Sequence, residues 1–438
     1  MNHKSASLAR YACGTAAIVI TVTRSLDWFS HPRFWAEDGT LWYQQALVYG
    51  WHAMLKPAEG YYQLISRIVA ELSLAFPVSA APSFFIFAAL FIQLSPALFL
   101  LTKRGSSLFK HPSVACAAAL VLVLLPSSSE INLAVTNSQW HLGLLGVEIT
   151  ALYLGPYRHN KLLIRDTVAA IICFLSGPFV VLILGALLVT LAIAKLKRSA
   201  ETVTIHPAVM VLIVISSLFE FISNRIGPPR TQFPILNPII QAGLYGEHAI
   251  GGLLLGERTS TIVFASWINS SAIHPKVAAI SMVIILAEVI WTLISKNSRI
   301  NLLIWYGLIA FEAAMFFPNM PGSAVPFSDP QLATRYFFLP MCGLLAFLAA
   351  VTHNLFSRSR ERPTAKALTG VLAAIASLTL LVAISKDFVL EYVPAPSWTH
   401  QLSVFKNSGE QTHQLAIAPP GWYVDLNRHD VLVRRILP

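Results

Sequence analysis

Charged residues are scarce in this chain of 438 residues: 12% are Asp, Glu, Lys or Arg, whereas 55% are hydrophobic. A soluble globular protein carries roughly 25% charged residues. The chain therefore lacks the polar surface that a soluble fold of this length needs. Apolar runs close to the ~20 residues that cross a bilayer recur along its whole length instead. We expect an all-α polytopic membrane protein.

Cysteine is also scarce, and several catalytic motifs are missing. The four cysteines lie inside apolar runs and form neither a CxxC pair nor a Cys/His metal spacing, so neither a disulfide framework nor a zinc site is expected. No Ser/His/Asp set, GxSxG, Walker loop or HExxH occurs. ATP hydrolysis and metalloprotease chemistry therefore have no support. We expect no cofactor, and a divalent metal has no supporting motif.

The net charge of +10 does not indicate a nucleic-acid partner, because the basic residues form short clusters between apolar runs. Such clusters mark the cytoplasmic loops of membrane proteins. No basic stripe with interleaved aromatic residues is present. The clusters are Lys103, Arg104 and Lys110; Arg158, Lys161 and Arg165; Lys195, Lys197 and Arg198; Lys296 and Arg299; and Arg358, Arg360, Arg362 and Lys366.

About eleven transmembrane helices are predicted, and the first is read as a retained span because no small-residue cleavage site follows it. Ser176-Gly177-Pro178 interrupts one long apolar run, and proline breaks helices. Two short spans that meet in an outer turn keep both flanking basic clusters inside. The predicted spans are 9–25, 83–102, 113–127, 141–156, 166–177, 178–195, 207–223, 275–295, 301–317, 337–355 and 366–386.

With the basic clusters inside, the outer connections hold most of the Pro, Gly, Trp and Tyr found outside the spans. We predict a transmembrane domain over 1–386 and a tail over 387–438 that forms a small outer cap with little regular structure. Residues 62–77 either cross the membrane or, as we favour, form an interfacial or re-entrant helix. The outer segments are 26–82, which is the long first loop, then 128–140, the 177–178 turn, 224–274, 318–336 and the tail.

Two adjacent acids, Glu37 and Asp38, follow the first span in a segment rich in tryptophan and phenylalanine. Ionised groups held beside hydrocarbon are costly and tend to mark function. One acid could act as a general base while the other orients it or binds a substrate hydroxyl. The alternative is that Glu37-Asp38-Gly39 only begins a helix whose first turn favours negative charge. The sequence does not decide which acid is the base.

Two further outer segments carry candidate binding groups. Hydrogen-bonding and stacking side chains that suit a sugar ring follow one another just before the fourth predicted span: Asn137, Gln139, Trp140 and His141. Arg335 and Tyr336 lie at the outer mouth of 337–355, where an arginine fork fits a phosphate. Arg225 and Arg230 offer more cations on the same side. Polar loop composition, interfacial anchoring and arginine snorkelling are the simpler alternatives.

Single carboxylates also lie inside or at the ends of the predicted spans, namely Glu148, Glu220, Glu288 and Glu312. Such groups could form an ion or proton path, which would favour a transporter. They are spread over different helices, and no pair of broken helices marks an inverted repeat. Hydrogen bonds between helices are the simpler interpretation.

The arrangement resembles the GT-C superfamily of integral membrane glycosyltransferases, in particular bacterial glucosyltransferases that decorate O-antigen. The likeness covers most of the chain and is one of architecture more than of close sequence. It rests on the early acidic motif Phe34–Gly39, Tyr61 and Tyr62 with Arg67, Thr136–His141, Ser176–Phe179 and Thr334–Tyr336. The chain departs from the superfamily in having Glu-Asp-Gly where others have Asp-Glu or a spaced Asp-x-Asp.

The resemblance implies a polyprenyl-phosphate-linked sugar as donor and a cell-envelope glycan or lipid, such as lipopolysaccharide, as acceptor. It implies an inverting hexosyl transfer at the periplasmic face of a bacterial inner membrane. Asp38 or Glu37 would be the base, Arg335 would hold the donor phosphate, and Tyr61, Tyr62 and Arg67 would contact substrate. The alternatives are a transporter or flippase of lipid-linked sugars and a scaffolding membrane subunit.

Overall fold

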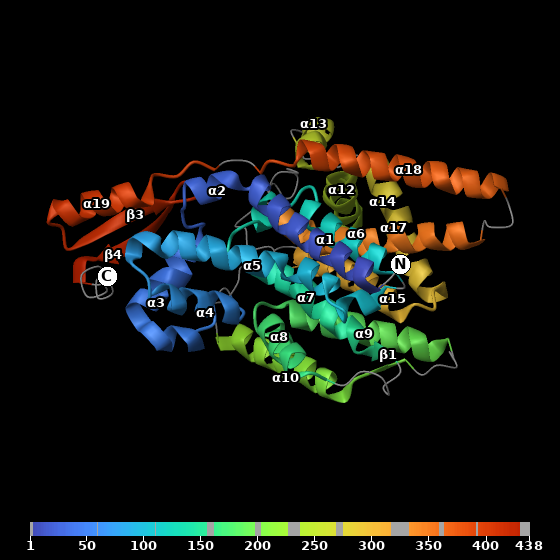
Figure 1. Cartoon of the computed structure of the whole chain (residues 1–438), viewed down its shortest axis with the longest axis horizontal. Coiled ribbons are helices and arrows are strands. Elements are labelled where there is room, and N and C mark those ends of the chain that lie inside the picture. Colours follow the sequence, from blue (N-terminus) through green and yellow to red (C-terminus); the bar gives the residue numbers. More distant parts are fainter. Residues whose placement is uncertain are drawn as a thin grey trace.

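The computed structural model describes residues 3–58, 60–109, 111–155, 162–197, 203–226, 237–268, 275–316, 333–358, 363–390 and 393–429. It is mostly helical and elongated (Figure 1). A helix occupies each of the eleven predicted spans: α1 His3–Arg24, α5 Ala81–Leu101, α6 Pro112–Leu124, α7 Ser138–Leu152, α8 Ile164–Phe174, α9 Phe179–Leu196, α10 Pro207–Ile226, α14 Pro275–Ile294, α15 Ser298–Phe316, α17 Phe338–Arg358 and α18 Pro363–Lys386.

Five helical segments of the described chain are long and apolar enough to cross a membrane by length and composition. They are Val78–Leu101, Phe179–Leu196, Pro207–Ile226, Pro275–Ile294 and Thr334–Ser357. The protein is therefore a multi-pass membrane protein by these criteria, while the count of eleven spans stays a prediction. The predicted interruption at Ser176–Pro178 separates two helices, α8 and α9.

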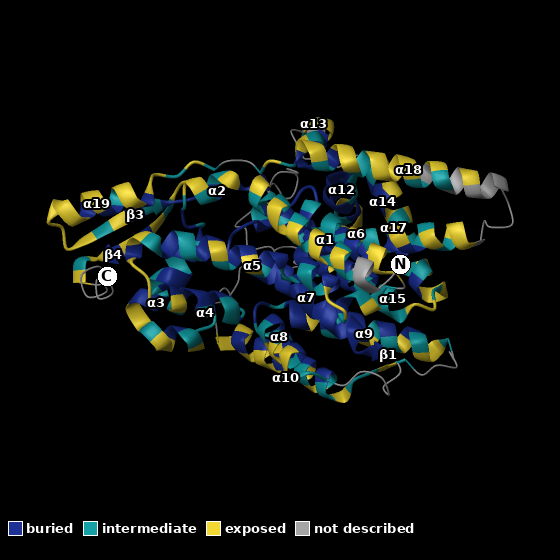
Figure 2. Ribbon diagram, in the orientation of Figure 1, coloured by how far each residue is buried: buried dark blue, intermediate teal, exposed yellow. Residues whose placement is uncertain are grey.

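The outer faces of the bundle are apolar. On α14, Val283 is 67% exposed and Leu286 57% exposed, although both are large aliphatic residues. Figure 2 shows exposed stretches along the outward sides of α10 and α18. Contiguous exposed apolar surface on this scale is typical of a lipid-facing helix rather than of a soluble protein.

Helix α7 forms the centre of the bundle, because every one of its 15 residues is buried. It is drawn almost wholly in the colour of buried residues (Figure 2). Close packing elsewhere in the core depends on glycine. At the crossing of α15 and α17, a Cβ on Gly307 would lie 2.9 Å from the Cα of Gly343. Small residues at such crossings let helix backbones approach.

The long first outer connection is folded into short helices. These are α2 Leu26–Ser30, the π-helix η1 Asp38–Tyr43, α3 Gln44–Tyr49, the 3₁₀-helix η2 Gly50–Leu55 and α4 Leu64–Ser73. Helix α4 lies in the segment 62–77, for which the sequence left open whether the chain crosses the membrane. Its 10 residues extend ~15 Å at 1.5 Å per residue, which is too short for a hydrocarbon core of ~30 Å.

The C-terminal tail is more regular than predicted, and the chain is not strictly all-α. After α18 it forms helix α19 Trp398–Ser408 and an antiparallel hairpin, β3 Thr412–Ile417 with β4 Trp422–Asn427. The prediction of little regular structure was wrong for this part. The hairpin has one buried face, on which Leu415, Ile417 and Val424 are 2% exposed or less. It packs beside the first loop at one end of the molecule (Figure 1).

The segment predicted as the second long outer loop, 224–274, also differs from expectation. Its described part forms α11 Pro238–Leu244, the π-helix η7 Tyr245–Gly251, α12 Gly252–Leu255 and α13 Glu257–Ile268. Leu244, Tyr245, Ala249 and Leu253 lie in the main core. Residues 238–255 are helical, so the prediction of a loop was wrong there. Tyr245, Glu247 and His248 lower the mean hydropathy of the segment, and it therefore did not stand out as an apolar helix.

The loops gather at two opposite ends of the helices. At one end, Arg104 pairs with Asp166 at 3.0 Å, and Arg299 donates to the Leu154 carbonyl at 3.2 Å. The two-residue strands β1 Leu154–Gly155 and β2 Thr204–Ile205 pair there. This end holds a described residue from each of four basic clusters: Arg104, Arg165, Lys197 and Arg299. The candidate site lies at the other end, since α7 separates the 130–137 loop from Leu154.

Candidate functional site

The acidic motif is held in place by the C-terminal cap. Ala418 donates its N–H to the Phe34 carbonyl at 3.2 Å, and the Ala36 N–H donates back to the Ala418 carbonyl at 2.5 Å. Ala36 has a φ of 40°, in the left-handed region that non-glycine residues rarely adopt. This turn begins η1 at Asp38 and sends the two neighbouring acids in different directions.

Asp38 points into the protein and is 2% exposed. Its Oδ2 accepts the Val135 N–H at 3.0 Å, and its Oδ1 accepts the Thr136 N–H at 2.6 Å. Burial raises the pKa of Asp38 well above its usual range, the two amide bonds oppose that shift, and the charge of Glu37 adds to it. Both carboxylate oxygens are therefore used to fasten the 130–137 loop to the first outer loop.

Glu37 is half-buried and immediately precedes η1. Its charge acts on two neighbours, the Asp38 carboxyl group and the Arg335 guanidinium. An acid from the N-terminal loop and a cation from the mouth of α17 are thus close enough to interact. Of the two acids, Glu37 is the one with a partly accessible side chain.

Arg335 is anchored by a carboxylate from the intervening loop. It lies in the 3₁₀-helix η8 Thr334–Phe337, beside the 3₁₀-helix η5 Ser129–Ile131. Its Nη1 is 3.8 Å from Glu130 Oε1, and its backbone N–H donates to Glu130 Oε2 at 3.2 Å. The Thr334 hydroxyl also reaches Glu130 Oε2 at 3.5 Å. Glu130 therefore holds the backbone of Arg335 through a hydrogen bond, while its pairing with the guanidinium is longer than a hydrogen bond.

Aromatic rings border this ion pair. The Arg335 guanidinium carbon is 5.1 Å from the centre of the Tyr336 ring. Trp140 lies edge-on to Tyr336 at 5.4 Å and to Phe179 at 4.7 Å. Trp140 Nε1 is buried and has no hydrogen-bond partner among the described residues. A buried indole N–H normally has a partner, so a ligand or a water molecule is the natural acceptor here.

Amide side chains connect the aromatic rings to the first loop. Gln139 and Gln63 each donate to the Tyr61 hydroxyl at 3.1 Å. Asn137 donates to the Glu130 carbonyl at 2.6 Å. Gly177 is needed for the close approach of the turn before α9, because a Cβ there would lie 2.6 Å from Gln139 Oε1. Of the predicted binding residues, Asn137 thus contacts Glu130, while Gln139 and Tyr61 bond to each other.

We call this group the acid–arginine cluster. It comprises Glu37, Asp38, Glu130, Trp140, Arg335 and Tyr336, and the Tyr61, Asn137 and Gln139 side chains adjoin it. Three widely separated segments of the chain contribute its members: 37–38, 130–140 and 335–336. The cluster offers a carboxylate that can accept a proton, an arginine that can hold an anion, and ring faces on which a sugar can stack.

Two predicted binding residues are used inside the first outer loop instead. Arg67 is 1% exposed, donates to Gln45 Oε1 at 2.7 Å and to the Lys56 carbonyl at 2.9 Å, and lies over the Trp42 ring at 4.8 Å. Burial lowers the pKa of Arg67 to about 10. The Tyr62 hydroxyl donates to the Met54 carbonyl at 2.6 Å. The structure does not bring either side chain to the acid–arginine cluster.

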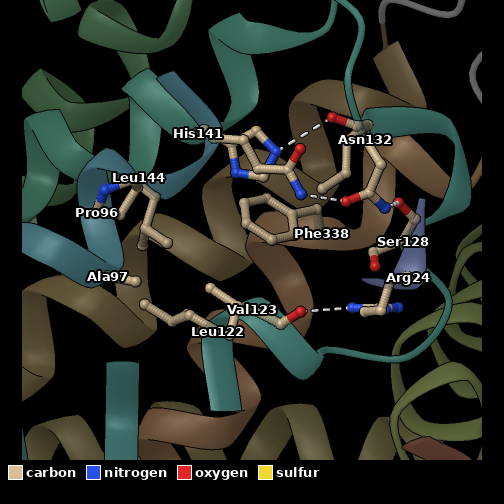
Figure 3. A pocket seen from close by; sticks show the side chains of 12 residues that line it. Arg24, Pro96, Ala97, Leu122, Val123, Ser128, Asn132, His141, Leu144 and Phe338 are labelled. Carbon is tan, nitrogen blue, oxygen red and sulfur yellow. Dashed lines mark hydrogen bonds between the residues drawn. The ribbon is translucent and has the colours of Figure 1, made fainter. Parts of the chain in front are cut away.

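His141 lines a separate interior cavity together with Gln93, Asn132 and Arg24 (Figure 3). Its Nε2 is 3.2 Å from the Ile131 carbonyl, and its ring packs against Phe338 at 5.1 Å. The small cavity beside it has a volume of about 10 Å³, which is room for about one water molecule. Gln93 and Asn132 form a hydrogen bond across the same site, and Arg24 donates to the Val123 carbonyl at 2.5 Å.

The remaining predicted cations lie elsewhere. Arg225 is exposed at the end of α10, with its guanidinium 5.2 Å from the centre of the Phe221 ring. Arg230 lies outside the described residues. Of the acids in spans, Glu220 accepts the Tyr62 N–H at 3.0 Å, and Glu288 accepts from the Tyr245 hydroxyl at 2.8 Å. The Glu288 bond joins two helices, η7 and α14, as the simpler interpretation predicted, whereas the partner of Glu220 lies in the first outer loop.

Two members of the neighbourhood were not predicted as site residues. Glu130 lies in the Ser-rich turn before the polar loop, and Phe179 follows the Gly177-Pro178 break. A signal for Glu130 existed, because an arginine at a helix mouth needs a counter-charge. Its distance of 205 positions from Arg335 hid the pairing. Within the described part of the chain, no group of three or more His, Cys, Asp or Glu could hold a metal ion.

Comparisons with known proteins add one distant likeness. No protein-family model and no curated protein matches the chain. The fold is similar to a solved archaeal oligosaccharyltransferase, AglB from Archaeoglobus fulgidus in complex with an inhibitory peptide and a dolichol-phosphate, with a TM-score of 0.37 and 11% sequence identity. The match covers 92% of this chain and 58% of that one, so this chain spans a little over half the length of that protein. A likeness at this level supports no inference about this chain.

Proposed function

We propose that this protein is a membrane glycosyltransferase that transfers a sugar from a polyprenyl-phosphate-linked donor to a cell-envelope glycan or lipid. The observation that carries the proposal is the Glu130–Arg335 ion pair beside the Tyr336 and Trp140 rings, with Glu37 within electrostatic range of Arg335, at the end of the bundle away from the basic loops. By the positive-inside rule this end is the outer one. The reaction then takes place at the periplasmic face of a bacterial inner membrane.

Glu37 is the general base in this proposal. It accepts the proton of the acceptor hydroxyl while that oxygen bonds to the anomeric carbon, and the bond from this carbon to the phosphate oxygen breaks. The configuration at the carbon inverts, and the polyprenyl phosphate leaves with the bonding electron pair. Glu37 is preferred over Asp38 because its side chain is partly exposed, whereas Asp38 is only 2% exposed and cannot reach an acceptor hydroxyl. Asp38 is then a positioning residue.

Arg335 holds the donor phosphate and stabilises the charge that builds on it as the bond breaks. Its present partner, Glu130, lies 3.8 Å from the guanidinium, so the pair is loose enough for the fork to turn toward a phosphate. The backbone bond from Arg335 to Glu130 keeps the residue in place meanwhile. Trp140 and Tyr336 supply the faces against which the sugar or the acceptor packs, and the unpartnered Trp140 N–H supplies a donor.

The experiment that tests this function is mass spectrometry of envelope glycans and glycolipids from cells with and without the gene. We expect one hexose to be missing without the gene and to return with the wild-type gene. It should not return with Arg335→Gln. The exposed Arg225→Gln serves as the control, because Arg225 lies outside the cluster, and it should restore the hexose. Identical glycans with and without the gene would exclude the proposal.

A further inference from the structure

A second polar site lies at the opposite end of the bundle, between α9, α14 and the start of α15. It is a cavity of about 420 Å³, within the range that holds small ligands. It belongs to the basic end of the molecule, since α9 runs away from the cap toward that end (Figure 1). Among the described residues it is lined by Thr190, Ile193, Ala194, Lys197, Val203, Leu293, Ile294, Ser295, Lys296, Ser298 and Asn301.

One of its lysines closes the end of α14. Lys197 Nζ donates to the Thr292 carbonyl at 2.7 Å and to the Ser295 carbonyl at 2.5 Å. These bonds cover carbonyl groups at the C-terminal end of the helix, which would otherwise repel an anion. Two of the three ammonium N–H groups are used in these bonds, which leaves one further N–H. Lys197 therefore makes this end of the cavity positive.

Two buried polar groups lining the cavity lack hydrogen-bond partners among the described residues. Asn301, 3% exposed, donates its amide to the Thr292 and Ser295 carbonyls at 3.2 and 3.3 Å, which fixes the opposite orientation for Oδ1. Asn301 Oδ1 and the Thr190 hydroxyl, on a residue 2% exposed, have no hydrogen-bond partner in the part of the chain that the structure describes. Buried polar atoms without partners are costly. A ligand that donates a hydrogen bond to Asn301 Oδ1 and forms another with the Thr190 hydroxyl would satisfy both atoms.

The charge at the mouth of the cavity and the apolar residues in its wall indicate which class of ligand fits. Lys296 lies exposed at the mouth, and none of the described lining residues is acidic. Ile193, Leu293 and Ile294 supply an apolar wall, and the last two are 49% and 66% exposed on the membrane-facing surface. The site thus combines two cations, a required hydroxyl donor and an apolar approach from the side of the lipids. Basic pockets between helix ends on the cytoplasmic side suit anionic lipid headgroups.

We propose that this cavity binds a phosphate-bearing ligand with a neighbouring hydroxyl group, in the class of glycerol phosphates. The phosphate lies between Lys197 and Lys296, and the hydroxyl donates to Asn301 Oδ1. The ligand is the headgroup of an anionic glycerophospholipid or a soluble glycerol phosphate. A zwitterionic choline headgroup fits less well, because its cationic end is repelled by the lysines and has no hydroxyl to donate.

The test is native mass spectrometry of the full-length protein in detergent, titrated with phosphatidylglycerol, with phosphatidylcholine and with glycerol 3-phosphate. We expect phosphatidylglycerol to bind at least about fivefold more tightly than phosphatidylcholine. Displacement of this lipid by millimolar glycerol 3-phosphate would support a soluble ligand of the same site. Retention of the lipid would support the headgroup. Equal binding of the two lipids with no binding of glycerol 3-phosphate would overturn the proposal.

Three variants locate the site. Lys296→Gln should weaken binding of phosphatidylglycerol about five- to tenfold, since it removes one cation from an exposed position without disturbing the fold. Thr190→Val should weaken it by a smaller factor while keeping the side-chain shape. Lys195→Gln is the matched control. Lys195 is exposed near the end of α9, at the same end of the molecule, but it does not line the cavity. Equal weakening by Lys195→Gln and Lys296→Gln would overturn the site.

Discussion

At the scale of single residues, the neighbouring acids Glu37 and Asp38 occupy different environments. Asp38 is fully enclosed and accepts two backbone N–H groups, whereas Glu37 is half-buried and lies within electrostatic reach of Arg335. Two like groups can take two roles when their surroundings differ. In our account Asp38 has a structural role and Glu37 a catalytic one, so substitutions at the two positions should have different effects.

The first prediction concerns the stability given by Asp38. Asp38→Asn keeps the size of the side chain but sets an NH₂ group against one of the two backbone N–H donors. A buried donor left without an acceptor costs about 1–3 kcal/mol. We expect the free energy of unfolding to fall by that amount and the thermal unfolding midpoint of the purified protein to fall with it. Glu410→Gln, at a cap acid whose pair with His413 is solvent-exposed, should lower the midpoint far less, because an exposed pair contributes about 0–1 kcal/mol.

The pH dependence of stability should carry the same signature. Burial raises the pKa of Asp38 in the folded protein above its unfolded value of about 3.9, so the folded state binds the proton more tightly. The stability from this group is complete below about pH 4 and is lost as the pH rises through the folded pKa. Asp38→Asn should remove that part of the slope when unfolding midpoints are measured from pH 4 upward. An unchanged slope would contradict the assignment.

The second prediction concerns the shape of the cation at position 335. Lysine keeps the charge but loses the planar fork that binds a phosphate through two bonds. We expect Arg335→Lys to lower kcat/KM for sugar transfer at least about tenfold, whereas Arg225→Lys should change it less than twofold. The measurement is transfer from a polyprenyl-phosphate sugar in membrane vesicles. Equal effects of the two substitutions on kcat/KM would contradict the role of Arg335 in binding the donor phosphate.

The sequence indicated the residue types of the cluster better than their partners. Glu37, Asp38, Trp140 and Arg335 stand out because acids, rings and cations are rare near apolar runs. That the amides of the 135–136 segment enclose Asp38 depends on packing between distant parts of the chain, which no local pattern records. Burial of Arg67 against Trp42 was hidden for the same reason.

At the scale of elements, the acidic motif and the C-terminal cap form one packed unit. Phe34 lies edge-on to Trp398 at 5.1 Å, and Trp398 Nε1 donates to the Val78 carbonyl at 2.9 Å. Gln44 donates to Asp425 at 3.2 Å. The cap therefore supports the turn that positions Glu37, although it contributes no member of the acid–arginine cluster.

The third prediction tests that support at Gly39. A Cβ on Gly39 would lie 2.6 Å from Val424 Cγ2 and 2.7 Å from Ile417 Cδ1, so Gly39→Ala must push the hairpin away from η1. We expect sugar transfer to fall severalfold and the cap to become more sensitive to protease. In Gly370→Ala, the matched control in α18, the new methyl group meets nothing within 4 Å. Wild-type transfer by Gly39→Ala would contradict the supporting role of the cap.

The sequence predicted the apolar helices well and the outer elements poorly. Long apolar runs form helices because a bilayer leaves the backbone few other ways to satisfy its hydrogen bonds. In the β3–β4 hairpin, buried and exposed residues alternate over only six residues per strand. So short a pattern, next to Pro419 and Pro420, did not suffice to predict strands. The buried helix over 238–255 was missed because polar side chains that bond inside the core lower its hydropathy.

At the scale of the whole molecule, two chemically distinct ends are joined by the membrane helices. One end gathers basic loops and the cavity beside Lys197, and the other gathers the acid–arginine cluster and the cap. The basic clusters predicted this division, since their positions along the chain alternate with the aromatic segments. The sequence did not predict how α5, α8, α9, α15 and α17 pack around α7, because those contacts join residues of separate helices and leave no local pattern.

The fourth prediction is that these ends face opposite sides of the membrane. Cysteine placed at exposed Lys103 or at exposed Ser403, each in a background without the four native cysteines, can be labelled with an impermeant maleimide. We expect Ser403→Cys to react in cells whose outer membrane alone is permeabilised. Lys103→Cys should react only after the inner membrane is opened. Labelling of both positions under the first condition would contradict the topology.

The central claim is that Glu37 takes the proton of the acceptor while Arg335 holds the donor. The rate of sugar transfer by Glu37→Gln, at an amount of folded protein equal to wild type, tests it most directly. A general base contributes about 10²–10⁴-fold, so we predict a loss in that range with the unfolding midpoint unchanged. A rate within twofold of wild type would contradict the account.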